Sequence, residues 1–353
     1  MVIHLKGLSE IRGIAALLVL VSHIDQFHEV LKLKSIGISN TGIAGHAVTI
    51  FFTLSGFLIT HLLLLEKEKT KGVDIKKFYI RRILRIWPAY YLTILFSLTL
   101  IFIGFFDLPT LNKLMISLGG YILIVPNILY TFGFTLAGTT PLWSIGVEEQ
   151  FYLIWPIIVK RVSKLKTILL ALIVFYVIIK LAIYLIHPTG AAYALVKLTR
   201  FDCMAFGALV PIFVNKGCKK IFSFIYHPLT QLASVTILVF PFFSKVHFIA
   251  NIEIEIYAIA STIWVTNVAL NSKTIISIKS SILRFFGKIS YGIYVYHLVI
   301  IYIIGSLDLN LNTTASYSIV LLVVSLFATF SYYFIEKKFI SLKESYSIIK
   351  SHA

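Results

Sequence analysis

The stretch SEIRGIAALLVLVSHIDQF at residues 9–27 places two ionisable side chains, Arg12 and His23, within an apolar segment. Eleven residues of an α-helix turn through about 1100° and rise about 16 Å, so both side chains fall on nearly the same face. We therefore expect Arg12 near one membrane surface and His23 well inside the bilayer. Ionisable groups at that depth are costly and usually face a polar cavity with a function. The alternative is that Arg12 reaches the lipid headgroups and that His23 is a packing residue.

The composition indicates an all-α polytopic membrane protein. Of the 353 residues, 58% are hydrophobic and only 13% are charged, against about 25% charged residues in soluble domains. The long apolar runs favour helices over the short alternating strands of a barrel. The formal net charge is +17, but the Lys and Arg residues lie in short loops, so membrane topology explains them better than a nucleic-acid partner. The two cysteines, Cys203 and Cys218, indicate neither a disulfide framework nor a metal site.

Hydropathy predicts about ten transmembrane helices with both termini in the cytoplasm. This topology puts 25 of the 32 Lys and Arg residues on the cytoplasmic side, in agreement with the positive-inside rule. A further apolar stretch, 114–134, contains Gly and Pro residues that weaken a helix, and a crossing there would move four basic residues at 160–166 outside. We expect it to be re-entrant or interfacial. The predicted spans are 12–30, 44–65, 86–106, 142–159, 167–187, 199–215, 223–243, 250–270, 285–304 and 316–336.

The domain organisation expected from this pattern is simple. A membrane domain covers residues 1–340, and a short cytoplasmic tail covers 341–353. The positive-inside pattern is typical of a multi-pass protein of the inner (plasma) membrane.

A basic cluster in FYIRRILRIWPAYY at 78–91 follows a lysine-rich loop. Arg82 and Arg85 are spaced i, i+3, and Arg81 and Arg85 are spaced i, i+4, so the three guanidinium groups share one side of a helix. Because Arg binds phosphate through two hydrogen bonds at once, the cluster suits a polyanionic ligand. The alternative is ordinary anchoring to anionic lipids on the cytoplasmic side.

Two carboxylates lie near the outer start of a predicted span, in PLWSIGVEEQFYLIWP at 141–156. Glu148 and Tyr152 are spaced i, i+4, whereas the adjacent Glu149 points about 100° away. A carboxylate within a membrane is a functional candidate with an expected cationic or imidazole partner. The alternative is an interfacial acid that the headgroups solvate.

Weaker signals come from other polar residues inside the spans. Ser55 precedes Gly56, and small residues in a span mostly indicate close helix packing. Arg200 and Asp202, at the start of a later span, form either a structural ion pair or part of a site. A polar stripe at i, i+4 and i+7 is formed by Ser290, Tyr294 and His297.

Together these motifs resemble the acyltransferase-3 family of integral membrane acyltransferases, from Leu8 to Phe339. The Arg–x10–His spacing of Arg12 and His23 is similar to the family signature. Thr49 stands where many members carry an acidic residue, and the resemblance is to a stand-alone form without a fused extracytoplasmic domain. The other matching segments are FFTLSGFLIT at 51–60, RRILRIWPAYYL at 81–92, LWSIGVEEQFYLIWP at 142–156, RFDCMAFG at 200–207, GKISYGIYVYH at 287–297 and YYFIEK at 332–337.

The resemblance implies transfer of an acyl group, most often acetyl from acetyl-CoA, to a hydroxyl of an extracytoplasmic glycan. Lipopolysaccharide O-antigen or another surface polysaccharide would be the acceptor. Because an imidazole has a free pKa of about 6.5 and suits proton transfer at neutral pH, we assign His23 as the general base. Glu148 would orient its ring or stabilise the imidazolium.

The remaining assignments follow from the same resemblance. We expect the partners to be acyl-CoA, a glycan or lipid-linked glycan and membrane lipids, with no nucleic acid and no metal. The expected donor-binding residues are Arg12, Arg81, Arg82 and Arg85. The expected supporting residues are Ser55, Trp143, Tyr152, Arg200, Asp202, Tyr294 and His297.

Three other functions fit parts of this pattern. Acylation of a small molecule of the macrolide type would use the same chemistry on a different acceptor. A proton-coupled transporter also contains buried ionisable residues, but the sequence has no paired broken helices in matching halves. A non-catalytic scaffold in an envelope complex explains the spans but gives no reason to bury Arg12, His23 and Glu148.

Overall fold

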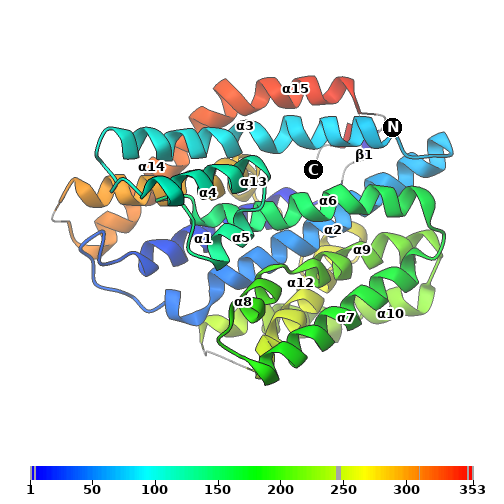
Figure 1. Cartoon of the computed structure of the whole chain (residues 1–353). Coiled ribbons are helices and arrows are strands. Elements are labelled where there is room, and N and C mark those ends of the chain that lie inside the picture. The colour runs from blue at the N-terminus through cyan, green and yellow to red at the C-terminus, as the bar shows by residue number, and fades with distance from the viewer. Residues whose placement is uncertain (1, 4, 244–247, 310, 348–349, 352–353) are drawn as a thin grey trace.

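The computed structural model consists almost entirely of helices (Figure 1) and describes residues 2–3, 5–243, 248–309, 311–347 and 350–351. The first half contains α1 (Leu8–Gln26), η1 (Ser39–Thr41), α2 (Ile43–Thr70), α3 (Ile75–Phe102), α4 (Leu111–Ile122), α5 (Pro126–Thr131), η2 (Thr140–Leu142), α6 (Trp143–Arg161) and α7 (Leu165–Ile186). The second half contains α8 (Ala191–Leu198), α9 (Phe201–Asn215), α10 (Lys219–Tyr226), α11 (Pro228–Val239), η3 (Phe240–Phe242), η4 (Ile249–Asn251), α12 (Glu253–Leu270), α13 (Ser281–Ser306), α14 (Thr313–Ser331), the π-helical turn η5 (Tyr332–Glu336) and α15 (Lys337–Ser345).

The all-α prediction is confirmed, and each of the ten predicted spans coincides with a helix or a helix pair. Within the described part of the chain, six helices are long and apolar enough to cross a membrane, and the bent pair formed by α10 and α11–η3 would make a seventh. Helices α1 and α6 are not among these six because they carry too many charged residues, and α9 is not among them because it has only 15 residues. Residues 114–134 lie in the short helices α4 and α5 and do not form one continuous span.

Glycines bring two pairs of helices into backbone contact. A Cβ atom on Gly56 of α2 would lie 1.9 Å from the carbonyl oxygen of Met204 in α9, and one on Gly207 of α9 would lie 1.9 Å from that of Thr53. Helices α1 and α13 meet in the same way, because a Cβ atom on Gly287 would lie 1.8 Å from the Ser9 carbonyl oxygen. No larger residue fits at these crossings without moving a helix.

The two ends of the described chain lie at the same end of the bundle (Figure 1). Strands β1 (Val2–Ile3) and β2 (Lys350–Ser351) pair in parallel, with Val2 opposite Lys350. Helix α15 runs back along α3 to reach this position.

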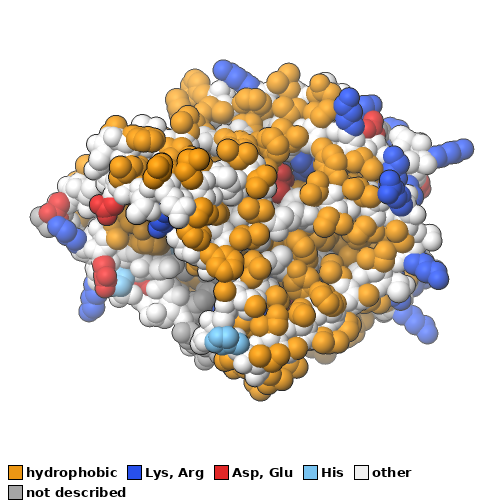
Figure 2. All heavy atoms as spheres, in the orientation of Figure 1, with side chains coloured by type: hydrophobic (Ala, Val, Ile, Leu, Met, Phe, Trp, Pro, Cys, Tyr) orange, Lys and Arg blue, Asp and Glu red, His pale blue; other side chains and the backbone are white. Residues whose placement is uncertain are grey.

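The surface carries the charge pattern of a membrane protein. Figure 2 shows a broad hydrophobic area across the middle of one face, while Lys and Arg side chains gather mainly along the right-hand edge, where α2 joins α3 and α6 joins α7. Among the described helices that are long enough to cross a membrane, α7 is the most apolar, and only 11% of its most apolar 18-residue stretch is buried in the protein. Such a surface is stable only against lipid.

Candidate active site

A cavity of about 1000 Å³ opens at the end of the bundle where the chain termini meet. Its walls come from α1, α2, α3, α6, α13 and the C-terminal helix α15. Polar side chains therefore reach it from segments far apart in the sequence. Those predicted as site residues are Arg12, Ser55, Arg81, Arg82, Arg85, Glu148, Tyr152 and Tyr294.

Helix α3 positions the arginine cluster, and the local sequence explains how it begins. Asp74 caps the helix, because its Oδ1 atom accepts a hydrogen bond of 3.0 Å from the backbone N–H of Lys77. This hydrogen bond to the backbone N–H of Lys77 lowers the pKa of the Asp74 carboxyl. The carboxylate form of Asp74 is thus favoured where it stabilises the helix N-terminus.

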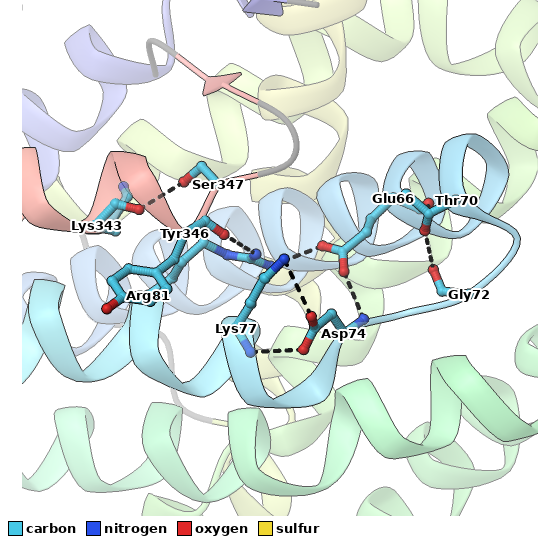
Figure 3. A network of polar contacts seen from close by, with 9 residues as sticks. All are labelled: Glu66, Thr70, Gly72, Asp74, Lys77, Arg81, Lys343, Tyr346 and Ser347. Atoms are coloured by element: carbon cyan, nitrogen blue, oxygen red, sulfur yellow. Dashed lines mark hydrogen bonds and ion pairs between the residues drawn. The ribbon is translucent and has the colours of Figure 1, made fainter.

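The three arginines differ in their partners. Arg81 is committed to the protein: Nη2 lies 2.9 Å from Oε2 of Glu66, and Nη1 donates a 3.0 Å hydrogen bond to the carbonyl of Tyr346 (Figure 3). Arg82 instead lies over the rings of Phe78 and Tyr152, at 5.6 and 5.4 Å, and its buried Nε has no hydrogen-bond partner.

Arg82 is therefore better placed than Arg81 to bind a ligand. No ion pair of Arg12, Arg82 or Arg85 is found among the described residues, although all three line the cavity. A cavity with three such unpaired cations favours an anionic ligand.

Glu148 lies in this cavity among the cations. Its Oε1 accepts a 2.7 Å hydrogen bond from Oγ of Ser55, and its Oε2 accepts one of 3.3 Å from the hydroxyl of Tyr152. Its charge interacts with those of Arg12 and Arg82. Glu149 points elsewhere, as the helical spacing predicts, and accepts a 3.1 Å hydrogen bond from the indole of Trp87.

His23 forms a pair with His297 of α13. Nδ1 of His23 lies 2.7 Å from Nε2 of His297, and the two rings are nearly parallel, with centroids 4.9 Å apart. Nδ1 of His297 lies 3.1 Å from the carbonyl oxygen of Ile293. Because a carbonyl only accepts, Nδ1 of a neutral His297 carries the proton and Nε2 accepts from His23. This arrangement leaves Nε2 of His23 with a free lone pair.

The histidine pair lies next to the cavity but is not part of its wall. Tyr294 is the link: it lines the cavity, its hydroxyl lies 2.6 Å from Oγ of Ser144, and its ring centroid lies 6.0 Å from that of His297. Within the described residues, no hydrogen bond joins His23 to Glu148. In the structure, the His23 imidazole pairs with His297, and the Glu148 carboxylate accepts hydrogen bonds from hydroxyl groups.

Asp25 fixes the loop that follows His23. Its carboxylate accepts hydrogen bonds from the backbone N–H groups of Ile36 and Ser39, at 2.7 and 2.8 Å, and from the hydroxyl of Tyr317 at 3.1 Å. The hydroxyls of Ser35 and Ser39 add two more. The chain beyond His23 is thus held close to the histidine pair.

Three of the predicted supporting residues lie elsewhere. Arg200 donates a 2.8 Å hydrogen bond to the carbonyl of Gly45 and lies over the ring of Trp143, at 5.6 Å. The suggested ion pair between Arg200 and Asp202 is not present among the described residues, because residues two apart do not face each other on a helix. Neither Arg200, Asp202 nor Trp143 lines the cavity.

A buried ion pair between Lys180 of α7 and Glu255 of α12 is not predicted from the sequence. The ammonium of Lys180 contacts Oε1 of Glu255, and it also donates a 3.3 Å hydrogen bond to the carbonyl of Asn251. Asp202 interacts with both members of the pair. Lys180 stands alone inside an apolar segment, and that isolation was the only signal in the sequence.

Among the described residues, no group of His, Cys, Asp and Glu side chains is arranged to hold a metal ion.

Comparison with known proteins places this architecture in a family. The profile of the family described as "Acyltransferase domain" (Acyl_transf_3) matches residues 6–334. The chain belongs to the acyltransferase-3 family. This is the family that the motifs around Arg12, His23 and Glu148 resemble. No solved structure matches the chain.

Three relatives show the range of similarity. The peptidoglycan O-acetyltransferase OatA of Listeria monocytogenes is 29% identical over 286 residues, which cover 72% of this chain and 44% of OatA. The putative peptidoglycan O-acetyltransferase YrhL of Bacillus subtilis is 28% identical, over 95% of this chain and 54% of YrhL. A putative O-acetyltransferase of Staphylococcus aureus is 24% identical, over 95% of this chain and 57% of that protein. The chain thus spans about half the length of these relatives.

Proposed function

We propose that this protein transfers an acetyl group from cytoplasmic acetyl-CoA to a hydroxyl of an extracytoplasmic glycan, within the bacterial inner membrane. The observation that carries the proposal is that two features lie next to each other. One is a cavity lined by arginines that have no ion pair among the described residues, and the other is His23, whose Nε2 keeps a free lone pair. These two features supply the two needs of acyl transfer: a site for an anionic donor and a base for an alcohol.

The donor would enter from the end of the bundle that holds the chain termini. Arg82, Arg85 and Arg12 would bind the phosphates of coenzyme A, because they line the cavity and none of them forms an ion pair among the described residues. The thioester would then extend along the cavity toward Tyr294. That side chain separates the cavity from the histidine pair.

The chemistry requires a base beside the thioester. Nε2 of His23 would take the proton of the acceptor hydroxyl, and the alcohol oxygen would attack the thioester carbonyl. The C–S bond then breaks, the acetyl group stays on the oxygen, and the coenzyme A thiolate receives the proton from the imidazolium. His297 would hold His23 in the productive tautomer, a role that we first expected of Glu148. Glu148 would instead fix the position of the cations around it.

The acceptor is proposed as a glycan of the cell envelope. The names of the relatives make peptidoglycan the first candidate, ahead of the lipopolysaccharide O-antigen that we expected from the sequence. A free hydroxyl on a sugar ring satisfies the chemistry in either glycan.

Ten crossings with both termini in the cytoplasm remain our proposal for the topology. Three observations support it: ten predicted spans coincide with helices, the chain ends pair with each other, and 25 of 32 basic residues fall on the proposed cytoplasmic side.

The test is mass spectrometry of peptidoglycan and surface polysaccharide from cells with the gene, without it, and with His23→Ala. We expect one glycan to lose its acetyl groups both in the deletion strain and in the His23→Ala strain, at equal protein level in the membrane. Full acetylation in the His23→Ala strain would refute the role of His23. Unchanged glycans in the deletion strain would refute the class of acceptor.

A further inference from the structure

The C-terminal helix α15 forms part of the wall of the arginine cavity. It follows the π-helical turn η5 and lies beyond residues 6–334, which the family profile matches. It runs back along α3 (Figure 1). Ile340, Lys343, Glu344 and Ser347 of this segment line the cavity.

Specific hydrogen bonds hold this segment in place. Arg81 joins Glu66 of α2 to the carbonyl of Tyr346, so one guanidinium links α2, α3 and the C-terminal segment (Figure 3). The hydroxyl of Ser347 donates a 3.1 Å hydrogen bond to the carbonyl of Lys343. The side chain of Lys343 is therefore carried by an anchored backbone rather than by a free tail.

Lys343 faces other cations without a counter-ion. Its charge interacts with those of Arg85, Arg82, Arg12 and Arg81. The described residues provide no ion pair and no hydrogen bond for its ammonium group. It is half-buried, whereas Lys337 and Lys338 of the same helix are exposed.

This arrangement has an electrostatic cost that a bound anion would remove. Like charges that share a partly buried cavity repel one another more strongly than in water. Removing a cation from such a group without a ligand relieves repulsion, whereas removing it in the presence of a polyphosphate removes an attraction. Replacement of a residue with a purely structural role would not stabilise the free protein and at the same time weaken its binding of the ligand.

We propose that Lys343 binds the phosphates of the acyl donor and that the C-terminal segment is a functional wall of the donor site. The inference rests on the proposed function, since it takes acetyl-CoA as the donor. It assigns a binding role to residues that we expected to form only a cytoplasmic tail. The same phosphate chemistry occurs in anionic lipid headgroups, and the experiment has to separate the two sources.

The test uses the full-length protein purified in phospholipid-free detergent and titrated with coenzyme A by calorimetry. Lys343→Met keeps the aliphatic stem and removes the charge, and Lys338→Met is the matched control on the exposed side of α15. We expect Lys343→Met to weaken binding about tenfold or more, as for loss of a hydrogen bond to a charged group. Lys343→Arg and Lys338→Met should bind like the wild type.

Thermal unfolding separates binding from folding. Without ligand, Lys343→Met should unfold at the wild-type temperature or above it, and the stabilisation by coenzyme A should shrink. Binding by Lys343→Met equal to that of the wild type, or an equal loss in Lys338→Met, would overturn the inference.

Two further results address the proposed function. If the wild type does not bind coenzyme A at all, the assignment of the donor fails and the inference about Lys343 fails with it. Mixed micelles that contain phosphatidylglycerol form the second arm. Weaker retention of that lipid by Lys343→Met, with coenzyme A binding unchanged, would identify a lipid site and reject the donor site.

Discussion

Nδ1 of His23 lies 2.7 Å from Nε2 of His297, and the second nitrogen of His297 is held by a backbone carbonyl of its own helix. The positions of the protons on the two imidazole rings follow from the carbonyl oxygen, which accepts a hydrogen bond and never donates one. The result is a directional pair in which one imidazole orients the other.

Replacing His297 tests that direction. His297→Phe keeps an aromatic ring but removes the acceptor for His23, so the His23 ring loses its fixed tautomer. We expect kcat to fall by about 10²-fold or more, with the KM for acetyl-CoA nearly unchanged, in assays of the purified enzyme with a soluble glycan. His297→Gln offers an acceptor oxygen and should recover part of the rate. Equal rates for wild type and His297→Phe would contradict the orienting role.

The arginine cluster predicts two different mutant phenotypes. Arg82 lines the cavity and has no ion pair among the described residues, so Arg82→Ala should weaken coenzyme A binding about tenfold or more. Arg82→Lys should recover only part of this affinity, because Lys lacks the planar fork. Arg81→Ala should instead loosen the C-terminal segment and increase its cleavage by protease, since Arg81 holds Glu66 and Tyr346. Identical protease sensitivity in Arg81→Ala and Arg82→Ala would contradict this division.

The contact between α2 and α9 depends on two glycines. Gly56→Ala puts a Cβ atom 1.9 Å from the Met204 carbonyl oxygen, so the helices must separate, at a cost of about 1–3 kcal/mol. We expect a lower unfolding temperature and a lower yield of folded protein in detergent. Gly119→Ala is the matched control, because nothing lies within 4 Å of its Cβ position. A loss of stability as large in Gly119→Ala would show that the crossing is not the cause.

The buried pair of Lys180 and Glu255 predicts a non-additive response. Glu255→Leu removes the carboxylate that Lys180 contacts inside the bundle and leaves only the charge of Asp202 near its ammonium, so the protein should be destabilised by up to about 3–5 kcal/mol. Lys180→Met should cost about as much, whereas the double variant should recover part of the stability because neither Lys180 nor Glu255 is left without the other. Unfolding curves of the four proteins provide the double-mutant cycle. Simple addition of the two losses would contradict a paired state.

The sequence predicts the helices well because hydropathy is a local property. Gly56 was read mainly as a packing residue, and it lies in backbone contact with α9. The i, i+4 spacing of Glu148 and Tyr152 predicts their contact, which the structure contains at 3.3 Å. Spacing on one helix is therefore a reliable guide to neighbours on that helix.

Partners on other helices were harder to predict. His23 and His297 are 274 residues apart, and no periodicity within one segment connects them. The three arginines share one side of α3, but only the fold shows that Glu66 and Tyr346 occupy Arg81. The family resemblance predicts Glu148 as the residue that orients His23, whereas tertiary packing gives each of them another partner.

The glycine crossings also determine which parts of the molecule are free to move. Helix α1 cannot slide along α13, nor α2 along α9, because in each pair one backbone fills the space beside the other. Entry of a bulky donor would then require movement of α3 and α15, which line the cavity without such a backbone contact. Spin labels on these two helix pairs should keep their separations when coenzyme A binds, and labels on α3 or α15 should report a displacement.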